Sequence, residues 1–145
     1  MKIRNSEFGM RNYENSEFGI RNAELGIGRV GMKSNVVAEK SKAFALKIIQ
    51  LYKYLCEGKN EFILSKQILR SGTSIGANIR ESLRGQSKPD FYSKMNISLK
   101  EADETAYWLE LLYESGYIDK SSFDIIYHDC QELIKLLVSI TKNQK

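Results

Sequence analysis

The stretch from Ser65 to Gly85, SKQILRSGTSIGANIRESLRG, decides the fold of this 145-residue chain. At about 100° per residue, its apolar positions fall together on one side of a helix. These positions are Ile68, Gly72, Ile75, Ile79 and Leu83. Four basic residues fall on the opposite side, namely Lys66, Arg70, Arg80 and Arg84. The pattern predicts a helix with one face toward a core and a basic outer face.

Small polar residues form a row between these two faces: Gln67, Ser71, Ser74 and Asn78. Gly72 and Gly76 also lie inside the predicted helix, where each glycine costs about 1 kcal/mol relative to alanine. Close approach of a second helix would offset that cost. We therefore predict a packing role, between helices or between subunits, for five residues: Ser71, Gly72, Ser74, Gly76 and Asn78.

Apolar residues at three-four spacing continue from Lys33 to the end of the chain and predict three further helices, which makes four in all. The first is expected to begin at a cap on Ser34 or Asn35 and to end at Gly58. The second, which holds the stretch above, is expected to run from about Asn60 to Gly85. The third opens at Ser87-Lys88-Pro89 and ends at Gly116, and Asp119 caps the fourth. Residues 33–145 are therefore predicted to form an all-α, up-down-up-down antiparallel four-helix bundle.

Residues 1–32 differ from the rest because they consist of imperfect, glycine-rich repeats: IRNSEFG at 3–9, NSEFG at 15–19 and IRNAELG at 20–26. Their scattered apolar side chains cannot offset the entropy lost on ordering. We expect a disordered low-complexity segment that is dispensable for folding. We interpret it as translated repetitive sequence ahead of a native start at Met32.

Composition narrows the compartment and the class of partner. The net charge of +4 and the isoelectric point near 9.0 permit contact with nucleic acid or another anionic surface. Cys56 and Cys130 are too few for a disulfide framework, and both fall on apolar helical stripes, so we predict buried, reduced thiols. No apolar run reaches the 18 residues of a membrane span, and the start of the chain has no signal-peptide pattern. A cytoplasmic protein without membrane contact is expected.

No arrangement of residues typical of catalysis is found. His128 is the single histidine, and there is no Glu-x-x-His pair of the kind that holds iron in helical bundles. Glu101, Asp103 and Glu104 are close in sequence, but acidic residues on an outer helix face are usually only solvated. We predict no catalytic residue, no metal site and no cofactor, and we expect a protein that is not an enzyme.

Two motifs carry a resemblance to a known family. The first reads Arg-Ser-x-x-Ser-Ile-x-x-Asn-Ile from Arg70 to Ile79, and the second reads Glu-Ala-Asp-Glu-Thr-x-Tyr-Trp-Leu from Glu101 to Leu109. With these motifs, the chain from Val36 to Thr141 resembles the bacterial four-helix bundle proteins of the 23S ribosomal RNA intervening-sequence family. Where many relatives read Asn-Ile-Ala-Glu-Gly, this chain reads Asn-Ile-Arg-Glu-Ser at 78–82, which makes its second helix more basic.

The resemblance implies a small helical bundle, without established catalytic activity, that assembles as a pentameric barrel. A related branch implies a role as the accessory protein of a reverse transcriptase in diversity-generating retroelements. In that branch a basic barrel surface is thought to contact nucleic acid and the enzyme. A reverse transcriptase or another protein client is therefore one implied partner, and RNA or DNA is the other.

Two functions remain open at this point. In the first, the protein is a non-catalytic, nucleic-acid-binding oligomer in which Lys66, Arg70, Arg80 and Arg84 contact phosphates. In the second, it is an assembly or adaptor protein, acting through protein-protein contacts only, whose basic second helix meets the acidic third helix of a neighbouring subunit. Exposure of the arginines in the oligomer would distinguish the two functions.

Overall fold

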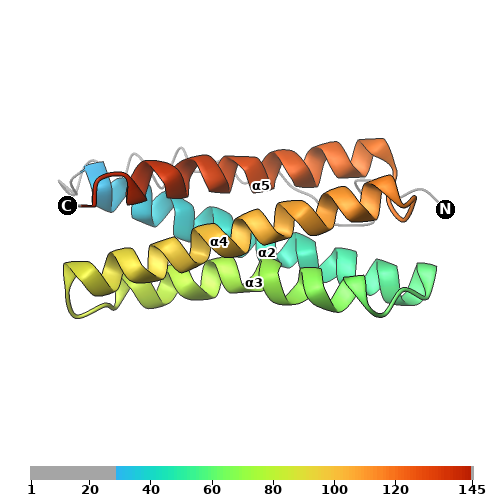
Figure 1. The fold of residues 1–145 in the computed structure, drawn as a ribbon, viewed down its shortest axis with the longest axis horizontal. Coiled ribbons are helices and arrows are strands. Elements are labelled where there is room, and N and C mark those ends of the chain that lie inside the picture. Colours follow the sequence, from blue (N-terminus) through green and yellow to red (C-terminus); the bar gives the residue numbers. More distant parts are fainter. Residues whose placement is uncertain (1–28, 145) are drawn as a thin grey trace.

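The computed structural model describes residues 29–144, which form four α-helices joined by short turns (Figure 1). These are α2 (Arg29–Lys59), α3 (Leu64–Leu83), α4 (Lys88–Glu114) and α5 (Lys120–Thr141). In Figure 1, α2 and α4 run from left to right, and α3 and α5 return. Each helix packs against its neighbours in sequence, and α5 also contacts α2. The predicted all-α, antiparallel four-helix bundle is confirmed, and the part of the chain described here contains no strand.

The core consists of the predicted apolar stripes of all four helices. Its fully buried members include Phe44, Ile48 and Leu55 of α2, Ile75 and Ile79 of α3, Met95 and Leu109 of α4, and Ile126, Cys130 and Leu137 of α5. Two predictions of burial are wrong. Leu83 is 45% exposed because it lies in the last turn of α3, on the flank that faces α2. Cys56 is only half-buried, with its Sγ 3.7 Å from the Ser65 Oγ.

Three predicted helix ends are found as expected. The Ser87 hydroxyl accepts the backbone N–H of Asp90 at 3.3 Å and caps α4, which has a proline in its first turn. The Asp119 carboxylate accepts the N–H of Ser122 at 2.9 Å and caps α5. Gly116 follows α4 with φ of +88°, a backbone conformation that glycine adopts without strain.

The end of α2 and the start of α3 differ from the prediction. Gly58 lies inside α2, which ends at Lys59, and Asn60 takes the left-handed conformation with φ of +52°. The N–H of Glu61 then bonds to the carbonyl of Leu55 at 2.9 Å, which closes the end of α2. Because asparagine tolerates the left-handed conformation, no glycine is needed there. The second helix therefore begins at Leu64 instead of Asn60, and it ends at Leu83, before Gly85.

The start of the first helix also differs, because α2 begins at Arg29 and no cap forms at Ser34 or Asn35. Ser34 is buried, and the Lys33 Nζ donates to the Ser139 Oγ of α5 at 2.6 Å. These contacts stabilise an additional helical turn ahead of the predicted start. The sequence predicts a disordered segment over residues 1–32. Residues 1–28 of it lie outside the described part of the chain, and residues 29–32 are helical.

Small residues allow α2 and α3 to approach closely. A Cβ atom added to Gly76 would lie 3.2 Å from the Ser41 Oγ and 3.5 Å from the Ser41 carbonyl oxygen. A Cβ atom added to Gly72 would lie 2.9 Å from both Cγ atoms of Ile48, which is fully buried. Gly72 therefore has no room for a side chain unless Ile48 moves.

We expect Gly72→Ala to lower the free energy of unfolding by about 1 kcal/mol, because overpacking a core costs typically 1–3 kcal/mol and outweighs the better helix propensity of alanine. The matched control is Gly58→Ala, since a Cβ atom there would lie at an ordinary 3.5 Å from the Tyr54 ring. That change should raise stability by roughly 0.5 kcal/mol. Urea unfolding measures both, and a gain for both variants would contradict close packing at Gly72.

Three lysines of α2, spaced seven residues apart, bond to side chains of α5, and we call them the lysine ladder: Lys33, Lys40 and Lys47. Lys33 bonds to Ser139 as above, and Lys40 pairs with Glu132. The Lys47 Nζ lies 2.5 Å from the Asp129 Oδ2. Spacing of seven keeps the three lysines on one side of α2, so they face α5 together.

Candidate nucleic-acid interface

The four basic residues predicted to bind phosphate lie on one face of α3 but not in one patch. Lys66 is in the first turn of α3, and Arg84 is its C-cap. Eighteen residues separate them, which is about 27 Å along a helix axis. Both side chains are exposed. Lys66 and Arg84 therefore lie near opposite ends of the bundle.

Arg70 is paired with acidic residues of α4 in the same subunit. Its Nη2 donates to the Glu104 Oε2 at 2.6 Å, and its Nη1 lies 3.8 Å from the Glu101 Oε1. The Trp108 Nε1 donates to the same Glu104 oxygen at 3.2 Å. An exposed pair of this kind adds little stability, but it neutralises the charge that a phosphate would meet.

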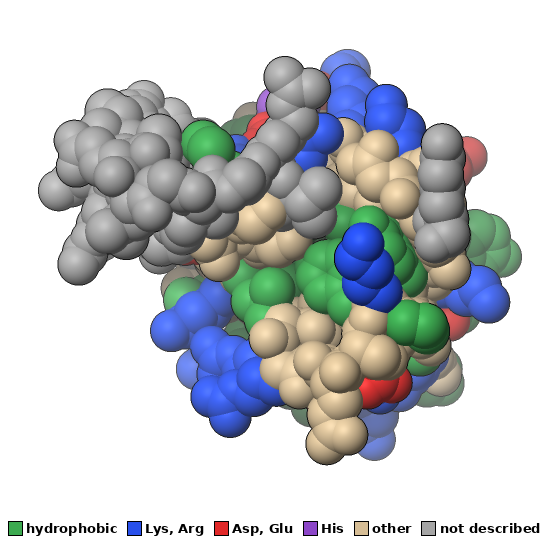
Figure 2. Space-filling model, turned by 90° about the vertical axis from the view of Figure 1, so that its left-hand side faces the viewer, with side chains coloured by type: hydrophobic (Ala, Val, Ile, Leu, Met, Phe, Trp, Pro, Cys, Tyr) green, Lys and Arg blue, Asp and Glu red, His purple; other side chains and the backbone are tan. Residues whose placement is uncertain are grey.

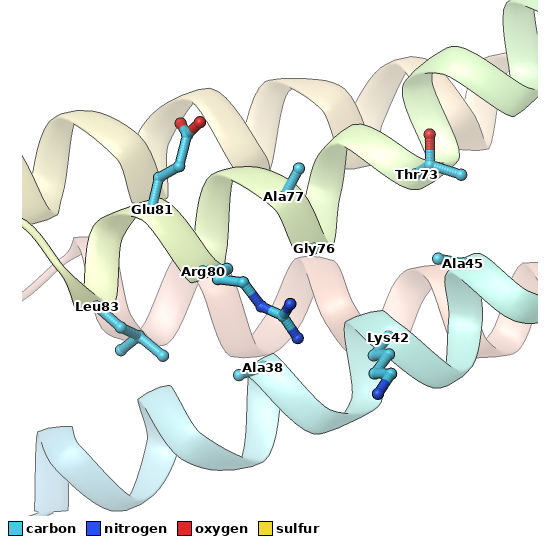
Figure 3. A pocket seen from close by; sticks show the side chains of 9 residues that line it. All are labelled: Ala38, Lys42, Ala45, Thr73, Gly76, Ala77, Arg80, Glu81 and Leu83. Atoms are coloured by element: carbon cyan, nitrogen blue, oxygen red, sulfur yellow. The ribbon is translucent and has the colours of Figure 1, made fainter.

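Arg80 lies beside a surface groove of about 490 Å³, which we call the α2–α3 groove (Figure 3). Small and apolar residues form most of its lining, namely Ala38, Ala45, Thr73, Gly76, Ala77 and Leu83. Lys42 of α2 and Arg80 of α3 supply one cation from each side, and in Figure 3 the guanidinium of Arg80 extends toward α2. Neither cation has an ion pair within residues 29–144. Glu81 also lines the groove, and Lys94 pairs with it at 3.1 Å.

The five residues predicted to have packing roles divide into two groups. Gly72 and Gly76 face α2 as described above, and the buried Ser71 hydroxyl accepts a bond from the Thr105 Oγ1 of α4 at 2.9 Å. Ser74 and Asn78 are half-buried, and each bonds to its own helix. The Ser74 hydroxyl donates to the carbonyl of Arg70 at 2.6 Å, and the Asn78 side-chain amide donates to the carbonyl of Ser74 at 2.8 Å.

Charge is separated along the bundle axis. Three contacts show which parts of the four helices lie side by side: Ser41 of α2 with Gly76 of α3, Ser98 of α4 with Ile75 of α3, and Cys130 of α5 with Ala102 of α4. These residues lie near one cross-section of the bundle. On one side of it, residues 31–44, 74–100 and 131–144 contain ten Lys and Arg and four Asp and Glu, a formal charge of +6. On the other side, residues 45–73 and 101–130 contain six Lys and Arg and ten Asp and Glu, a formal charge of −4. We call these the basic half and the acidic half.

The end of the basic half carries four basic residues that we call the basic end: Lys33, Arg84, Lys88 and Lys142. Arg84 directly follows α3, Lys88 is the first residue of α4, and the other two lie near the start of α2 and just after α5. Figure 2 looks onto this end and shows Lys and Arg side chains around and over an apolar centre, with only small acidic areas. Residues that are far apart in the sequence thus form one positive surface.

His128 and Cys130 lie in opposite environments, one on the surface and one in the core. His128 is largely exposed, with its Nε2 3.8 Å from the Glu132 Oε2. Burial, together with the nearby charges of Asp103 and Asp129, raises the pKa of the Cys130 thiol to about 12, so this thiol stays protonated near neutral pH. Within residues 29–144 there is no group of three or more His, Cys, Asp or Glu residues that could hold a metal ion. No helix in that range is both long and apolar enough to span a membrane.

A family model described as 23S rRNA-intervening sequence protein matches residues 33–139, which include nearly all of the bundle. The chain belongs to this family. The resemblance carried by the motifs at Arg70–Ile79 and Glu101–Leu109 is therefore confirmed.

A solved structure is also similar to this member of the 23S rRNA-intervening sequence family. It is a crystal structure of a protein with unknown function from the S23 ribosomal protein family of Bacteroides thetaiotaomicron. The two sequences are 56% identical, and the alignment covers 76% of this chain and 98% of that chain with a TM-score of 0.75. Among curated proteins, none matches this chain.

Proposed function

We propose that this protein is a non-catalytic, nucleic-acid-binding oligomer that acts in the cytoplasm, with its basic end against the phosphates of RNA or DNA. The separation of charge along the bundle carries the proposal, because one half with a formal charge of +6 attracts a polyanion more strongly than the net charge of +4 spread over the whole chain would. Arg84 stays in the predicted contact set, and Lys88 joins it. Lys66 lies in the acidic half, and Arg70 is already paired with Glu104.

Binding through phosphates, without reading of bases, fits the position of the aromatic residues. Stacking on bases needs an exposed ring. The exposed rings among residues 29–144 are Phe62 and Tyr107, and both belong to the acidic half. In the basic half, Tyr92 is buried and Phe91 packs against it at 5.0 Å between ring centroids. The basic end thus offers charge but no stacking surface.

Assembly is the second part of the proposal, with five subunits as the specific number that the family resemblance implies. Each subunit offers only a few unpaired cations, so its own affinity for a polyanion should be low. In a cyclic oligomer every subunit presents the same surface, and several weak contacts act together.

The test compares two double variants that remove the same charge. Arg84→Ala with Lys88→Ala removes two cations of the basic end, and Lys53→Ala with Lys66→Ala removes two exposed cations of the acidic half. Fluorescence anisotropy with labelled RNA and DNA, between about 50 and 200 mM salt, gives the slope of log affinity against log salt. The first variant should lower the magnitude of this slope by about 1.4 on single strands and about 1.8 on duplex DNA per engaged subunit. The control should leave it unchanged.

Two results would contradict the proposed function. One is absence of binding by the wild-type protein even at about 50 mM salt, where phosphate contacts are strongest. The other is an equal loss for both double variants, which would mean that only net charge matters and that the basic end has no special role. Circular dichroism on both variants checks that the helices remain intact.

A further inference from the structure

The α2–α3 groove has the chemistry of a docking site for an acidic, partly apolar ridge. Its floor consists of side chains no larger than threonine, since Gly76 and the alanines leave the space between the helices unfilled. Lys42 and Arg80 stand on opposite sides of it and have no carboxylate partner among residues 29–144. Leu83 adds an apolar side chain that is 45% exposed.

A surface with complementary properties lies on α4 of the same chain, and we call it the α4 ridge: Asp103, Tyr107, Glu110 and Glu114. Spacing of four, three and four residues places these side chains on one side of the helix. Tyr107 is 53% exposed, although it is a large aromatic residue. Asp103 and Glu114 are exposed and have no ion pair within the described residues.

We propose that the α2–α3 groove of one subunit receives the α4 ridge of a second copy of this chain. The lengths agree, because the ridge spans about 16 Å and the α3 side of the groove, from Thr73 to Leu83, spans about 15 Å. The Tyr107 ring enters the small-residue floor, and the free carboxylates of the ridge meet Lys42 and Arg80. This contact brings an exposed aromatic ring and two carboxylates, Asp103 and Glu114, against two cations, and none of these charged groups has an ion pair among residues 29–144.

The two surfaces cannot meet within one subunit. The groove opens between α2 and α3, whereas the ridge lies on the α5 side of α4, where the Tyr127 hydroxyl of α5 donates to Glu110 at 3.0 Å. Two different surfaces in contact produce a head-to-tail arrangement, which closes into a ring or extends as a fibre. The inference rests on the proposed assembly and adds the surfaces that make it.

Charge reversal tests the contact independently of its exact register. The groove variant carries Lys42→Glu and Arg80→Glu, and the ridge variant carries Asp103→Lys and Glu114→Lys. Each should raise the dissociation constant of the oligomer at least about a hundredfold, because like charges face each other across the contact. The chain with all four changes should recover the wild-type mass in size-exclusion chromatography with light scattering. The control, Lys53→Glu with Lys66→Glu, reverses two exposed charges outside the groove and should assemble normally.

An equimolar mixture of the groove variant and the ridge variant adds a test of ring size. Complementary contacts form only when the two chains alternate, so the mixture can close rings with an even number of subunits but not a ring of five. Assembly of the mixture into an even-numbered species, while each variant alone stays dissociated, is the expected result.

The outcomes separate the two proposals. A wild-type oligomer that is unaffected by either reversal would overturn the groove-and-ridge contact and leave assembly itself standing. A wild-type monomer at micromolar concentration would overturn both. Loss of assembly in the groove variant without recovery in the fourfold variant would also overturn the contact, because the groove would then meet a surface of the neighbouring subunit other than the α4 ridge.

Discussion

Replacing Asp129 with alanine should lower the free energy of unfolding by about 3 kcal/mol, near the low end of the 3–5 kcal/mol observed when one partner of a buried ion pair is removed. The Lys47 side chain is only 10% exposed, and its ammonium group would lose its partner at 2.5 Å. The Asp129 side chain is 30% exposed, which lets water reach the pair and moderates the loss. Thermal unfolding should shift downward by about 12 °C for a domain of this size.

The neighbouring Lys120–Asp124 pair of α5 provides the control. It has the same chemistry at a similar distance of 2.7 Å, but its side chains are 73% and 54% exposed. Asp124→Ala should therefore cost about 0.5 kcal/mol or less. A double change, Lys47→Met with Asp129→Leu, should recover most of the lost stability, since an apolar pair can replace a buried ion pair. Equal losses for Asp129→Ala and Asp124→Ala would show that the lysine ladder is fully hydrated.

Glu61→Ala should cost about 2 kcal/mol, at the top of the range for loss of a helix cap. Glu61 is buried, and its carboxylate accepts the backbone N–H groups of Ile63, Leu64 and Ser65 at 3.2, 3.1 and 2.7 Å. Alanine would leave these donors at the start of α3 without a partner, and the favourable interaction of the carboxylate with the helix dipole would also be lost.

Two further variants separate the cap from a general effect of charge. Glu61→Gln keeps an acceptor oxygen and should lose less stability than the alanine variant. Glu57→Ala removes an exposed carboxylate from the last turns of α2 and should change stability by less than about 0.5 kcal/mol. Urea unfolding measures all three variants, and the slope of the free energy of unfolding against urea concentration should stay unchanged. If Glu61→Ala and Glu57→Ala are equally mild, the start of α3 does not depend on this carboxylate.

The helices could be predicted from sequence because three-four spacing of apolar residues is a local property. The stripe of α5, for example, contains Ile126, Cys130, Leu133 and Leu137, all of which are buried. The end of α2 could not be predicted in the same way. Gly58 has the residue type of a helix stop, yet Asn60 and Glu61 together end one helix and begin the next. That arrangement depends on a left-handed asparagine and a buried acid, and neither follows from periodicity.

The candidate site was predictable only as one face of one helix. The pairing of Arg70 with Glu104 depends on which turn of α4 lies level with Arg70, and the basic end depends on which helix termini meet. Both are properties of the packed bundle. One signal was available in the sequence, since Lys33, Lys40 and Lys47 recur at seven residues, a spacing that places charge along a contact with another helix.

The separation of charge gives each subunit an electric dipole along its long axis, and this affects how it meets a polyanion. At physiological ionic strength, electrostatic interactions are screened beyond about 8 Å, a distance much shorter than the bundle. When the basic end is within that distance, the acidic half is too far away to feel the same field. The dipole also rotates an approaching subunit so that the basic end arrives first, which increases the fraction of encounters that are productive. Capture of a polyanion would then become much slower as salt is added, although the protein carries a modest net charge.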